Sequence, residues 1–231
     1  MDAHRKRAWE ALEIGPLWRS REASEQVPEQ VPEPPQPVQP LTWTQLQQTV
    51  SGCTACSLSN SRQKTVFGVG AQPAPWMLVG EAPGQQEDAS GEPFVGPAGQ
   101  LLDQMLAAIG VNRRTDVFIT NVLKCRPPAN RDPSPEEVSR CEPYLKRQVD
   151  LVQPRLILVL GRFAAHSLLG TDASLVSLRG VVHSYASAAG PIPLVVTYHP
   201  AYLLRNLPEK ARSWSDLCLA RRTFDAAAGP D

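Results

Sequence analysis

Four cysteines are the residues of this 231-residue chain whose spacing most clearly permits metal chemistry. Cys53 and Cys56 form a C-x-x-C pair, while Cys125 and Cys141 follow far along the chain. Structural zinc sites usually have a second close pair, which is missing here, whereas an iron–sulfur cluster accepts cysteines from separate elements. The spacing therefore favours an iron–sulfur cluster, with zinc or unrelated buried cysteines as alternatives. Cys218, flanked by leucines, is expected to be a small buried apolar residue.

Two further segments contain residues suited to a catalytic pocket. Residues 80–84 (GEAPG) predict a tight turn whose backbone N–H groups can approach a ligand. A phosphate loop is the rival interpretation, but the Gly-x-Gly-x-x-Gly and Gly-Lys-Ser/Thr patterns are absent from this turn. Phe94, in a loop of glycines and prolines, is either a plug on the core or a stacking platform. His199 carries an ionisable ring, and Leu203 and Leu204 beyond it are either core residues or a wedge for a base stack.

The elements that must position these residues read as an alternation of strands and helices. Apolar runs predict buried strands at 76–79, 117–122, 156–160 and 194–197. Helical patterns follow at 41–50, 99–109, 135–151, 162–169 and 208–226. This order predicts an α/β fold with three α/β/α layers around a central four-stranded parallel sheet. Ligands bind beyond the carboxyl ends of such strands, where Glu81, Asn121 and His199 stand.

Composition bounds the class of protein. Lysine plus arginine equals aspartate plus glutamate at 23 each, so net charge gives no indication of a nucleic-acid partner. The sequence has neither the roughly 18 apolar residues of a membrane helix nor a secretory signal. We therefore expect a cytoplasmic protein without membrane contact, in which cysteines stay reduced or bind metal.

The beginning of the chain differs from the rest. Residues 1–22 predict a short amphipathic peptide, residues 23–40 a proline-rich disordered linker, residues 41–226 one globular domain, and residues 227–231 a tail. The peptide is either a frayed terminus or a docking motif that folds on a partner. Its RKRAWEALEIGPLW pattern is similar to the segment by which the psi subunit of the bacterial clamp loader binds its chi partner, which implies a replisome or clamp-loader component as partner.

Together these motifs resemble the family 4 uracil-DNA glycosylases, the iron–sulfur type of many bacteria and archaea. The likeness covers about residues 41–220 and rests on GEAPG, QQED, GEPFVGPAGQLLD, NVLKCRPPANRDPSPEEVSRC and HPAYLLR. It implies a uracil-DNA glycosylase-like domain and a monomeric, monofunctional enzyme that excises uracil from single- or double-stranded DNA and leaves an abasic site. It also implies a [4Fe–4S] cluster, whose ligands would be Cys53, Cys56, Cys125 and Cys141.

The resemblance assigns the recognition of the base to three side chains. Phe94 would stack on the flipped uracil, and the Asn121 amide would read uracil O4 and N3–H, where cytosine presents the reverse pattern. Glu87 would crowd the C5 edge against the methyl group of thymine.

The chemistry is assigned to the two strand-end loops. His199 would donate to uracil O2, assisted by backbone N–H groups of the Glu81–Ala82 turn. Glu81 or Asn130 would position the attacking water. The family 1 enzymes have an aspartate where this chain has Ala82, which weakens the assignment of a strong base.

Contacts to DNA are expected around the flipped nucleotide. Leu203 and Leu204 would form the wedge, and the cations predicted to meet phosphates are Lys124, Arg126, Arg131 and Arg205. The cluster would brace the loops that carry Asn121 and Asn130. A variant that traps the abasic sugar has a histidine in the segment matching 128–133, and this chain has none there. The remaining alternative is a noncatalytic iron–sulfur module that binds DNA or transfers electrons.

Overall fold

The computed structural model describes residues 41–227 together with His4, Arg7 and Ala11. The chain divides into two compact units, residues 1–32 and 33–231, and the elements discussed below belong to the second. Three segments lie outside the described residues: the predicted peptide apart from those three positions, the linker at 23–40, and residues 228–231. The predictions made for these segments remain untested.

Within residues 41–227 the strands form one six-stranded mixed sheet in the order β1-β3-β2-β4-β6-β5. Their bounds are β1 (Val69–Gly70), β2 (Trp76–Gly80), β3 (Val117–Asn121), β4 (Leu156–Leu160), β5 (Val182–Ser187) and β6 (Gly190–Thr197). The four central strands run parallel, which confirms the predicted parallel core. All residues of β2, β3 and β4 are buried, as a strand covered on both faces requires. The antiparallel edge strands, the two-residue β1 and the six-residue β5, were not predicted.

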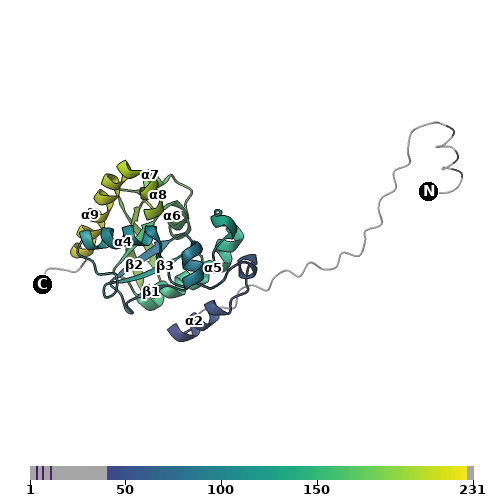
Figure 1. Ribbon diagram of the computed structural model, residues 1–231, viewed down its shortest axis with the longest axis horizontal. Helices are drawn as coiled ribbons and strands as arrows, with labels where there is room; N and C mark the ends of the chain where they lie inside the picture. Colours follow the sequence, from purple (N-terminus) through teal and green to yellow (C-terminus); the bar gives the residue numbers. More distant parts are fainter. Residues whose placement is uncertain (1–3, 5–6, 8–10, 12–40, 228–231) are drawn as a thin grey trace. The chain divides into compact units, whose positions relative to one another are not determined.

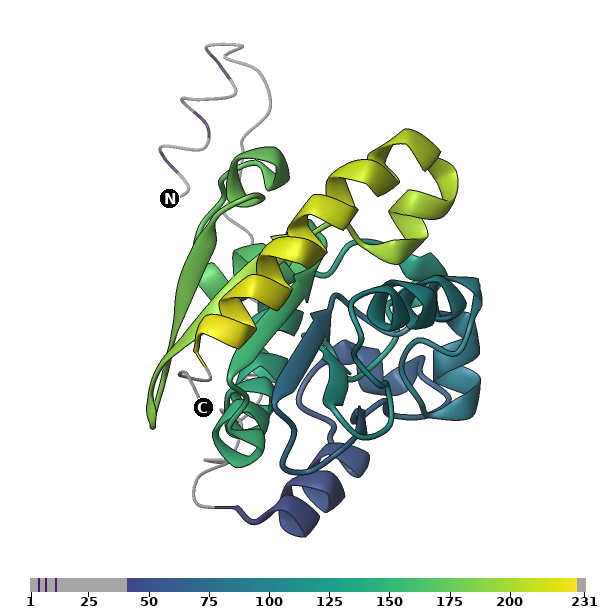
Figure 2. The same cartoon turned by 90° about the vertical axis from the view of Figure 1, so that its left-hand side faces the viewer.

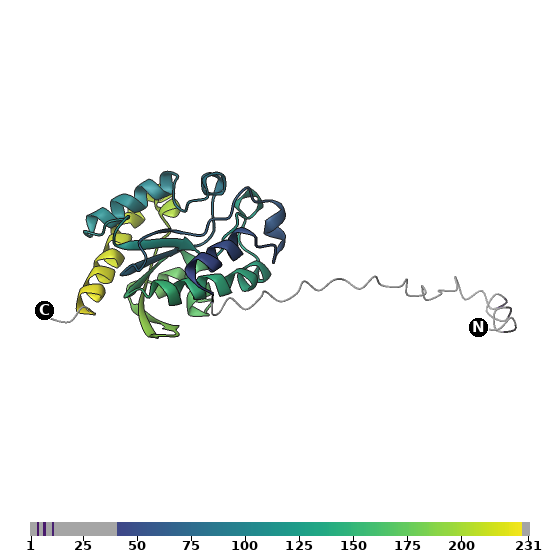
Figure 3. The same ribbon diagram turned by 90° about the horizontal axis from the view of Figure 1, so that it is seen from below.

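Helices cover both faces of the sheet, as Figure 3 shows. The α-helices are α2 (Trp43–Ser51), α3 (Gln85–Ser90), α4 (Pro97–Ala108), α5 (Pro135–Val152), α6 (Arg162–Leu169), α7 (Leu175–Leu178), α8 (Pro200–Arg205) and α9 (Lys210–Ala226) (Figure 1). The 3-10 helices are η1 (Ser57–Asn60), η2 (Pro128–Asn130) and η3 (Leu207–Glu209). None of the helices within the described residues is long and apolar enough to span a membrane.

Successive side chains of β2 divide the core into two layers. Met77 and Val79 pack with the buried faces of α2, α5 and α6, whereas Trp76 and Leu78 pack with those of α4 and α9. Figure 2 shows α9, in yellow, lying across one face of the sheet. This alternation follows from the period of two in a strand and yields the three layers predicted from the sequence.

Strand register aligns the carboxyl ends of the parallel strands. Gly80 of β2 pairs with Asn121 of β3, and Leu160 of β4 pairs with Thr197 of β6. The loops that follow these residues therefore meet at one edge of the sheet, where such folds bind ligands.

Candidate active site

A cavity of about 560 Å³ opens at this edge. The predicted site residues that line it are Glu81, Ala82, Glu87, Phe94, Asn121, Asn130, Arg131, His199 and Arg205. Its wall also contains Arg162 and Phe163, which sequence reasoning missed. Their position could have predicted them, because they directly follow Gly161 at the carboxyl end of β4, where such folds bind ligands.

Asn121 ends β3 and is only 2% exposed. Its side-chain Oδ1 is buried and has no hydrogen-bond partner among the described residues. An unsatisfied buried acceptor costs about 1–3 kcal/mol, so its retention requires an explanation such as a donor that a ligand supplies. Gly80 makes room for it, because a Cβ there would lie 2.7 Å from Phe94 Cζ and still closer to Asn121 Oδ1.

Phe94 lies between α3 and α4 and is buried, with a left-handed backbone at φ 56°. Its ring stacks on the imidazole of His199, with centroids 5.5 Å apart and planes inclined by 28°. Phe94 therefore contacts the core and also lines the cavity, so the two interpretations offered by the sequence are compatible.

Glu87 on α3 lines the cavity, and its carboxylate holds the loop that carries Phe94. Oε1 accepts hydrogen bonds from the backbone N–H groups of Val95 at 3.0 Å and Gly96 at 3.3 Å. Oε2 accepts from the N–H of Gly84 at 3.1 Å. Glu87 thus joins the GEAPG turn to the Phe94 loop, in addition to any contact with a ligand.

His199 is the N-cap of α8, and its Nδ1 accepts a hydrogen bond from Ala201 N–H at 3.1 Å. Burial, and next the nearby Arg205 cation, lower the pKa of His199 to about 4, with Glu87 opposing them. The imidazole is therefore neutral near pH 7, and because Nδ1 is an acceptor, the ring proton sits on Nε2. Gly161, at φ 95°, allows this packing, since a Cβ there would lie 3.1 Å from His199 Cβ.

Glu81 directly follows β2 and faces the cavity. Burial, and then the negative charge of Asp132, raise its pKa to about 7, while Arg162 acts in the opposite direction. A carboxyl group with such a pKa is divided between its acid and base forms near neutral pH, as a general base requires.

Asn130 reaches the cavity from an exposed position in η2, with φ 53°. Its Oδ1 accepts a hydrogen bond from Arg126 Nε at 2.7 Å. This contact uses one of the two acceptor positions of the Asn130 oxygen.

The predicted phosphate contacts fall into different environments. Arg205 is exposed at the end of α8 and lines the cavity. Arg131 is also partly exposed, but its guanidinium makes two hydrogen bonds to the carboxylate of Glu137.

The prediction for Lys124 is wrong. Its side chain is 1% exposed, and Nζ donates to Asn121 O at 2.6 Å and to Thr120 Oγ1 and Gln148 Oε1 at 2.7 Å each. Burial lowers the pKa of Lys124 to about 8. Three acceptors compensate for the desolvation of this cation, which stabilises the end of β3 instead of reaching a phosphate.

The two leucines after His199 separate. Leu203 is 1% exposed and packs in the core with α4 and α9, whereas Leu204 is 42% exposed. The wedge hypothesis therefore narrows to Leu204, and Leu203 has the environment of a core residue.

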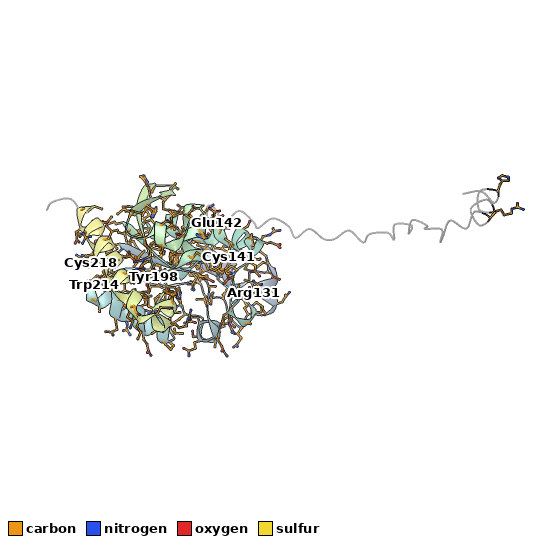
Figure 4. All side chains as sticks on the ribbon, turned by 90° about the horizontal axis from the view of Figure 1, so that it is seen from above. Arg131, Cys141, Glu142, Tyr198, Trp214 and Cys218 are labelled. Atoms are coloured by element: carbon orange, nitrogen blue, oxygen red, sulfur yellow. The ribbon has the colours of Figure 1, made fainter. Side chains whose placement is uncertain are left out.

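The four cysteines line one apolar cavity on the α2–α5 side of the sheet. Cys53 and Cys56 lie between α2 and η1, Cys125 follows β3, and Cys141 lies in α5. Cys218, on α9, does not line this cavity, and Figure 4 shows it well apart from Cys141.

Hydrogen-bond donors surround three of these sulfurs. Tyr144 Oη–H donates to Cys53 Sγ at 3.2 Å, and Arg62 Nη1 donates to Cys125 Sγ at 3.1 Å. The N–H of Lys124 donates to the Cys141 sulfur at 3.3 Å. Donors directed at sulfur fit the environment of thiolates that bind metal.

Burial opposes ionisation of the Cys125 and Cys141 thiols, against the effect of the nearby Arg62 and Lys124 cations. It raises the pKa of Cys125, and it raises that of Cys141 to about 12. Thiolates at these positions need a strong positive partner such as bound metal. Among the described residues, no three His, Cys, Asp or Glu side chains stand close enough to hold a single ion.

Comparison with known proteins gives consistent matches over most of the chain. The family model of the uracil DNA glycosylase superfamily matches residues 67–219. The chain is 47% identical over 159 residues to the type-4 uracil-DNA glycosylase of Archaeoglobus fulgidus, which covers 67% of this chain and 79% of the relative. It is 43% identical over 178 residues to the type-4 enzyme of Pyrobaculum aerophilum, with coverages of 75% and 90%. For that of Thermotoga maritima the identity is 42% over 164 residues, with coverages of 71% and 83%.

Proposed function

The chain belongs to the uracil DNA glycosylase superfamily, among its type-4 enzymes, and from this premise we propose how its residues excise uracil. The protein is a hydrolase of base-excision repair that flips uracil out of DNA and cleaves its N-glycosidic bond. The noncatalytic alternative has no support among these relatives. The observation that carries the mechanism is the unpaired Oδ1 of Asn121 in a cavity that Phe94 and His199 also line.

Asn121 reads the flipped base by the polarity of its hydrogen bonds. Its Oδ1 accepts from uracil N3–H, while its amide group donates to O4. Cytosine has an acceptor at N3 and a donor at C4, so both contacts would be mismatched. A buried site that leaves polar groups unpaired rejects such a base strongly. Phe94 supplies the surface on which the ring stacks, and Glu87 closes the cavity at the C5 edge.

His199 stabilises the departing uracil anion. Its neutral ring presents Nε2–H as a donor to uracil O2, because Nδ1 is already occupied by the N–H of Ala201. The N–H groups of the Glu81–Ala82 turn add donors at the same edge of the base. Donors that are fixed before the reaction stabilise developing charge without reorganisation. Arg205 contributes a positive charge close enough to affect the ionisation of His199.

Glu81 is the group that positions the attacking water, with Asn130 as a secondary contact. The carboxylate form is available near pH 7 because the pKa of Glu81 is raised to about 7. A base with a pKa near the working pH combines sufficient ionisation with useful proton affinity. Asn130 instead uses its oxygen to accept from Arg126.

Contacts to DNA surround this cavity. Arg162 and Arg205 are exposed on its wall and are suited to phosphate contacts that fix the register of the strand. Arg131 reaches the same wall while paired with Glu137. Leu204 is the apolar side chain available to replace the flipped base in the stack.

We also propose that the four cysteines bind a [4Fe–4S] cluster. Four sulfurs around one apolar cavity, with N–H and O–H donors directed at them, fit a cube that takes one cysteine per iron. When bound, the cluster supplies a rigid link between the α2–η1 segment, the segment after β3, and α5. Cys125 stands four residues after Asn121, so this link would fix the strand end that reads the base.

Uracil-containing DNA is the partner that the family implies. We propose that the enzyme acts on it as a monomer in the cytoplasm, at the nucleoid. We also propose that the tryptophan-containing peptide at 1–22 docks on a replisome or clamp-loader component.

An oligonucleotide with one uracil tests the proposed chemistry. Incubation with the wild-type protein should produce strand breaks only after alkali treatment, because a monofunctional glycosylase leaves an intact abasic strand. The His199→Gln variant, examined in parallel, should release uracil far more slowly. DNA binding without release, or release at equal rates by both proteins, would overturn this mechanism.

A further inference from the structure

We propose that Arg113 is a positioning residue for the uracil-stacking ring: with Glu87 it forms a two-sided clamp that holds Phe94 in its left-handed conformation. The inference rests on the stacking role proposed above for Phe94. It goes beyond that role by naming the group that keeps the platform in place, a residue outside the motifs that predicted the site.

Phe94 needs such support because of its backbone. At φ 56° it occupies a region that L-residues with bulky side chains rarely adopt. Strained conformations of this kind persist when the surroundings over-determine them, and they concentrate at ligand sites. Gly99 packs directly against this backbone, since a Cβ there would collide with the Phe94 carbonyl.

One side of the clamp binds the amides that follow Phe94. The carboxylate of Glu87 accepts from the N–H groups of Val95 at 3.0 Å and Gly96 at 3.3 Å. Glu87 lies on α3, and its other carboxylate oxygen accepts from Gly84 of the GEAPG turn.

The other side binds the carbonyls that precede those amides. Arg113 Nη2 donates to Pro93 O at 2.9 Å and to Phe94 O at 3.1 Å. Its Nη1 donates to Asp103 Oδ1 on α4 at 2.6 Å. A guanidinium can make these contacts at once because its donors form a rigid planar fork, which the point charge of lysine does not provide.

The loop that presents Arg113 is itself fixed. Asn112 N–H donates to Asp116 Oδ2, and Arg114 N–H donates to Asn112 Oδ1, each at 2.8 Å. Arg113 is not among the described residues that line the catalytic cavity. It therefore acts through the Phe94 loop and not through contact with the base.

The clamp makes a specific kinetic prediction. Arg113→Met should lower kcat/KM on uracil-containing DNA and weaken inhibition by free uracil, each by about tenfold, the usual effect of losing a hydrogen bond to a charged group. Arg113→Lys, which keeps the charge but loses the fork, should show most of this loss. Arg114→Met is the matched control, because it removes a cation from the same loop outside the clamp and should retain near wild-type values.

Salt dependence separates the clamp from a phosphate contact. If Arg113 only neutralised a phosphate, Arg113→Met would reduce the slope of log affinity against log salt, and Arg113→Lys would restore it. The clamp predicts an unchanged slope for both variants. A reduced slope for Arg113→Met would overturn the proposal.

A double-mutant cycle with Phe94→Ala tests whether Arg113 acts through Phe94. Once the ring is removed, Arg113→Met should cause little further loss of kcat/KM, whereas a general structural effect would be additive. Thermal denaturation of all four proteins identifies any unfolded variant, and if Arg113→Met is unfolded, Arg113→Lys takes its place in the cycle. If Phe94→Ala lowers activity and the Arg113 variants do not, the clamp is wrong. If Phe94→Ala itself has no effect, the stacking role is wrong.

Discussion

Phe94 and His199 stack on each other, with ring centroids 5.5 Å apart and an angle of 28° between their planes. One residue comes from the loop between α3 and α4, and the other precedes α8. The proposed base-stacking ring and the donor to the leaving group therefore support each other. A change that displaces one of them is expected to affect both recognition and catalysis.

Asn121→Ala is expected to lower kcat/KM by about 10²-fold or more, because two hydrogen bonds to the base are lost. The free energy of unfolding should stay constant or increase, since Oδ1 of Asn121 has no partner among the described residues of the free protein. Single-turnover kinetics and urea denaturation measure these two quantities. Full activity in a destabilised variant would contradict the assignment.

The raised pKa of Glu81 should determine how the rate of uracil release depends on pH. If its carboxylate positions water, the single-turnover rate should rise with pH and level off above about 7, where the pKa of Glu81 lies. Glu81→Gln should be slower and lack this inflection. An unchanged inflection in Glu81→Gln would assign the titration to another group.

The pKa of Glu81 is raised and that of His199 is lowered, so the two residues should change the pH dependence of stability in opposite directions. The pKa of Glu81 is raised from 4.5 to about 7, so its contribution to stability is full below pH 4.5 and is lost as pH rises through 7. The pKa of His199 is lowered from 6.5 to about 4, so its contribution is full above pH 6.5 and is lost as pH falls through 4. Relative to wild type, Glu81→Gln should therefore become more stable as pH rises from 4.5 to 7. His199→Gln should become more stable relative to wild type as pH falls from 6.5 to 4. Urea denaturation at several pH values tests this, and parallel curves for all three proteins would contradict it.

The fold was largely predictable because the four central strands are apolar runs buried on both faces. The edge strand β5 was not, since its burial alternates but its residue types do not follow that alternation: Val182 and Ala186 are exposed, whereas His183 and Ser187 are on the less exposed face. Lys124 was misassigned because a lysine in a polar motif is usually exposed, and the acceptors that bury it come from separate elements. Three features depend on tertiary packing, which the local sequence does not reveal. They are the contact between Phe94 and His199, the burial of Leu203, and the contacts of Arg113 with the Phe94 loop.

Replacement of single cysteines should distinguish the ligands of the proposed cluster from a cysteine that does not bind it. Cys141→Ser is expected to lose the iron and the visible absorption of the purified protein, since a four-iron cube needs its fourth cysteine. Cys218→Ser is the matched control and should keep both, because Cys218 lies away from the cysteine cavity. Metal analysis also distinguishes iron from zinc. Equal metal content in the two variants would exclude Cys141 as a ligand.

The two leucines of α8 should respond differently to alanine. Leu203→Ala should lower the free energy of unfolding by about 2–5 kcal/mol, as for buried leucines, with the rate on single-stranded DNA largely retained at low temperature. Leu204→Ala should leave stability almost unchanged but slow uracil release from duplex DNA more than from single strands, because only the duplex needs a wedge. Equal slowing on both substrates would remove Leu204 from base expulsion.

The proposed mechanism depends on a buried amide, that of Asn121, which reads uracil by hydrogen-bond polarity. Single-turnover base release on one oligonucleotide, with uracil, cytosine or thymine at the same position, tests it most directly. Uracil should be released rapidly, and cytosine at a rate at least about 10⁴-fold lower, the discrimination expected of a site with mismatched buried polar groups. Comparable release of cytosine and uracil by the wild-type protein would contradict it.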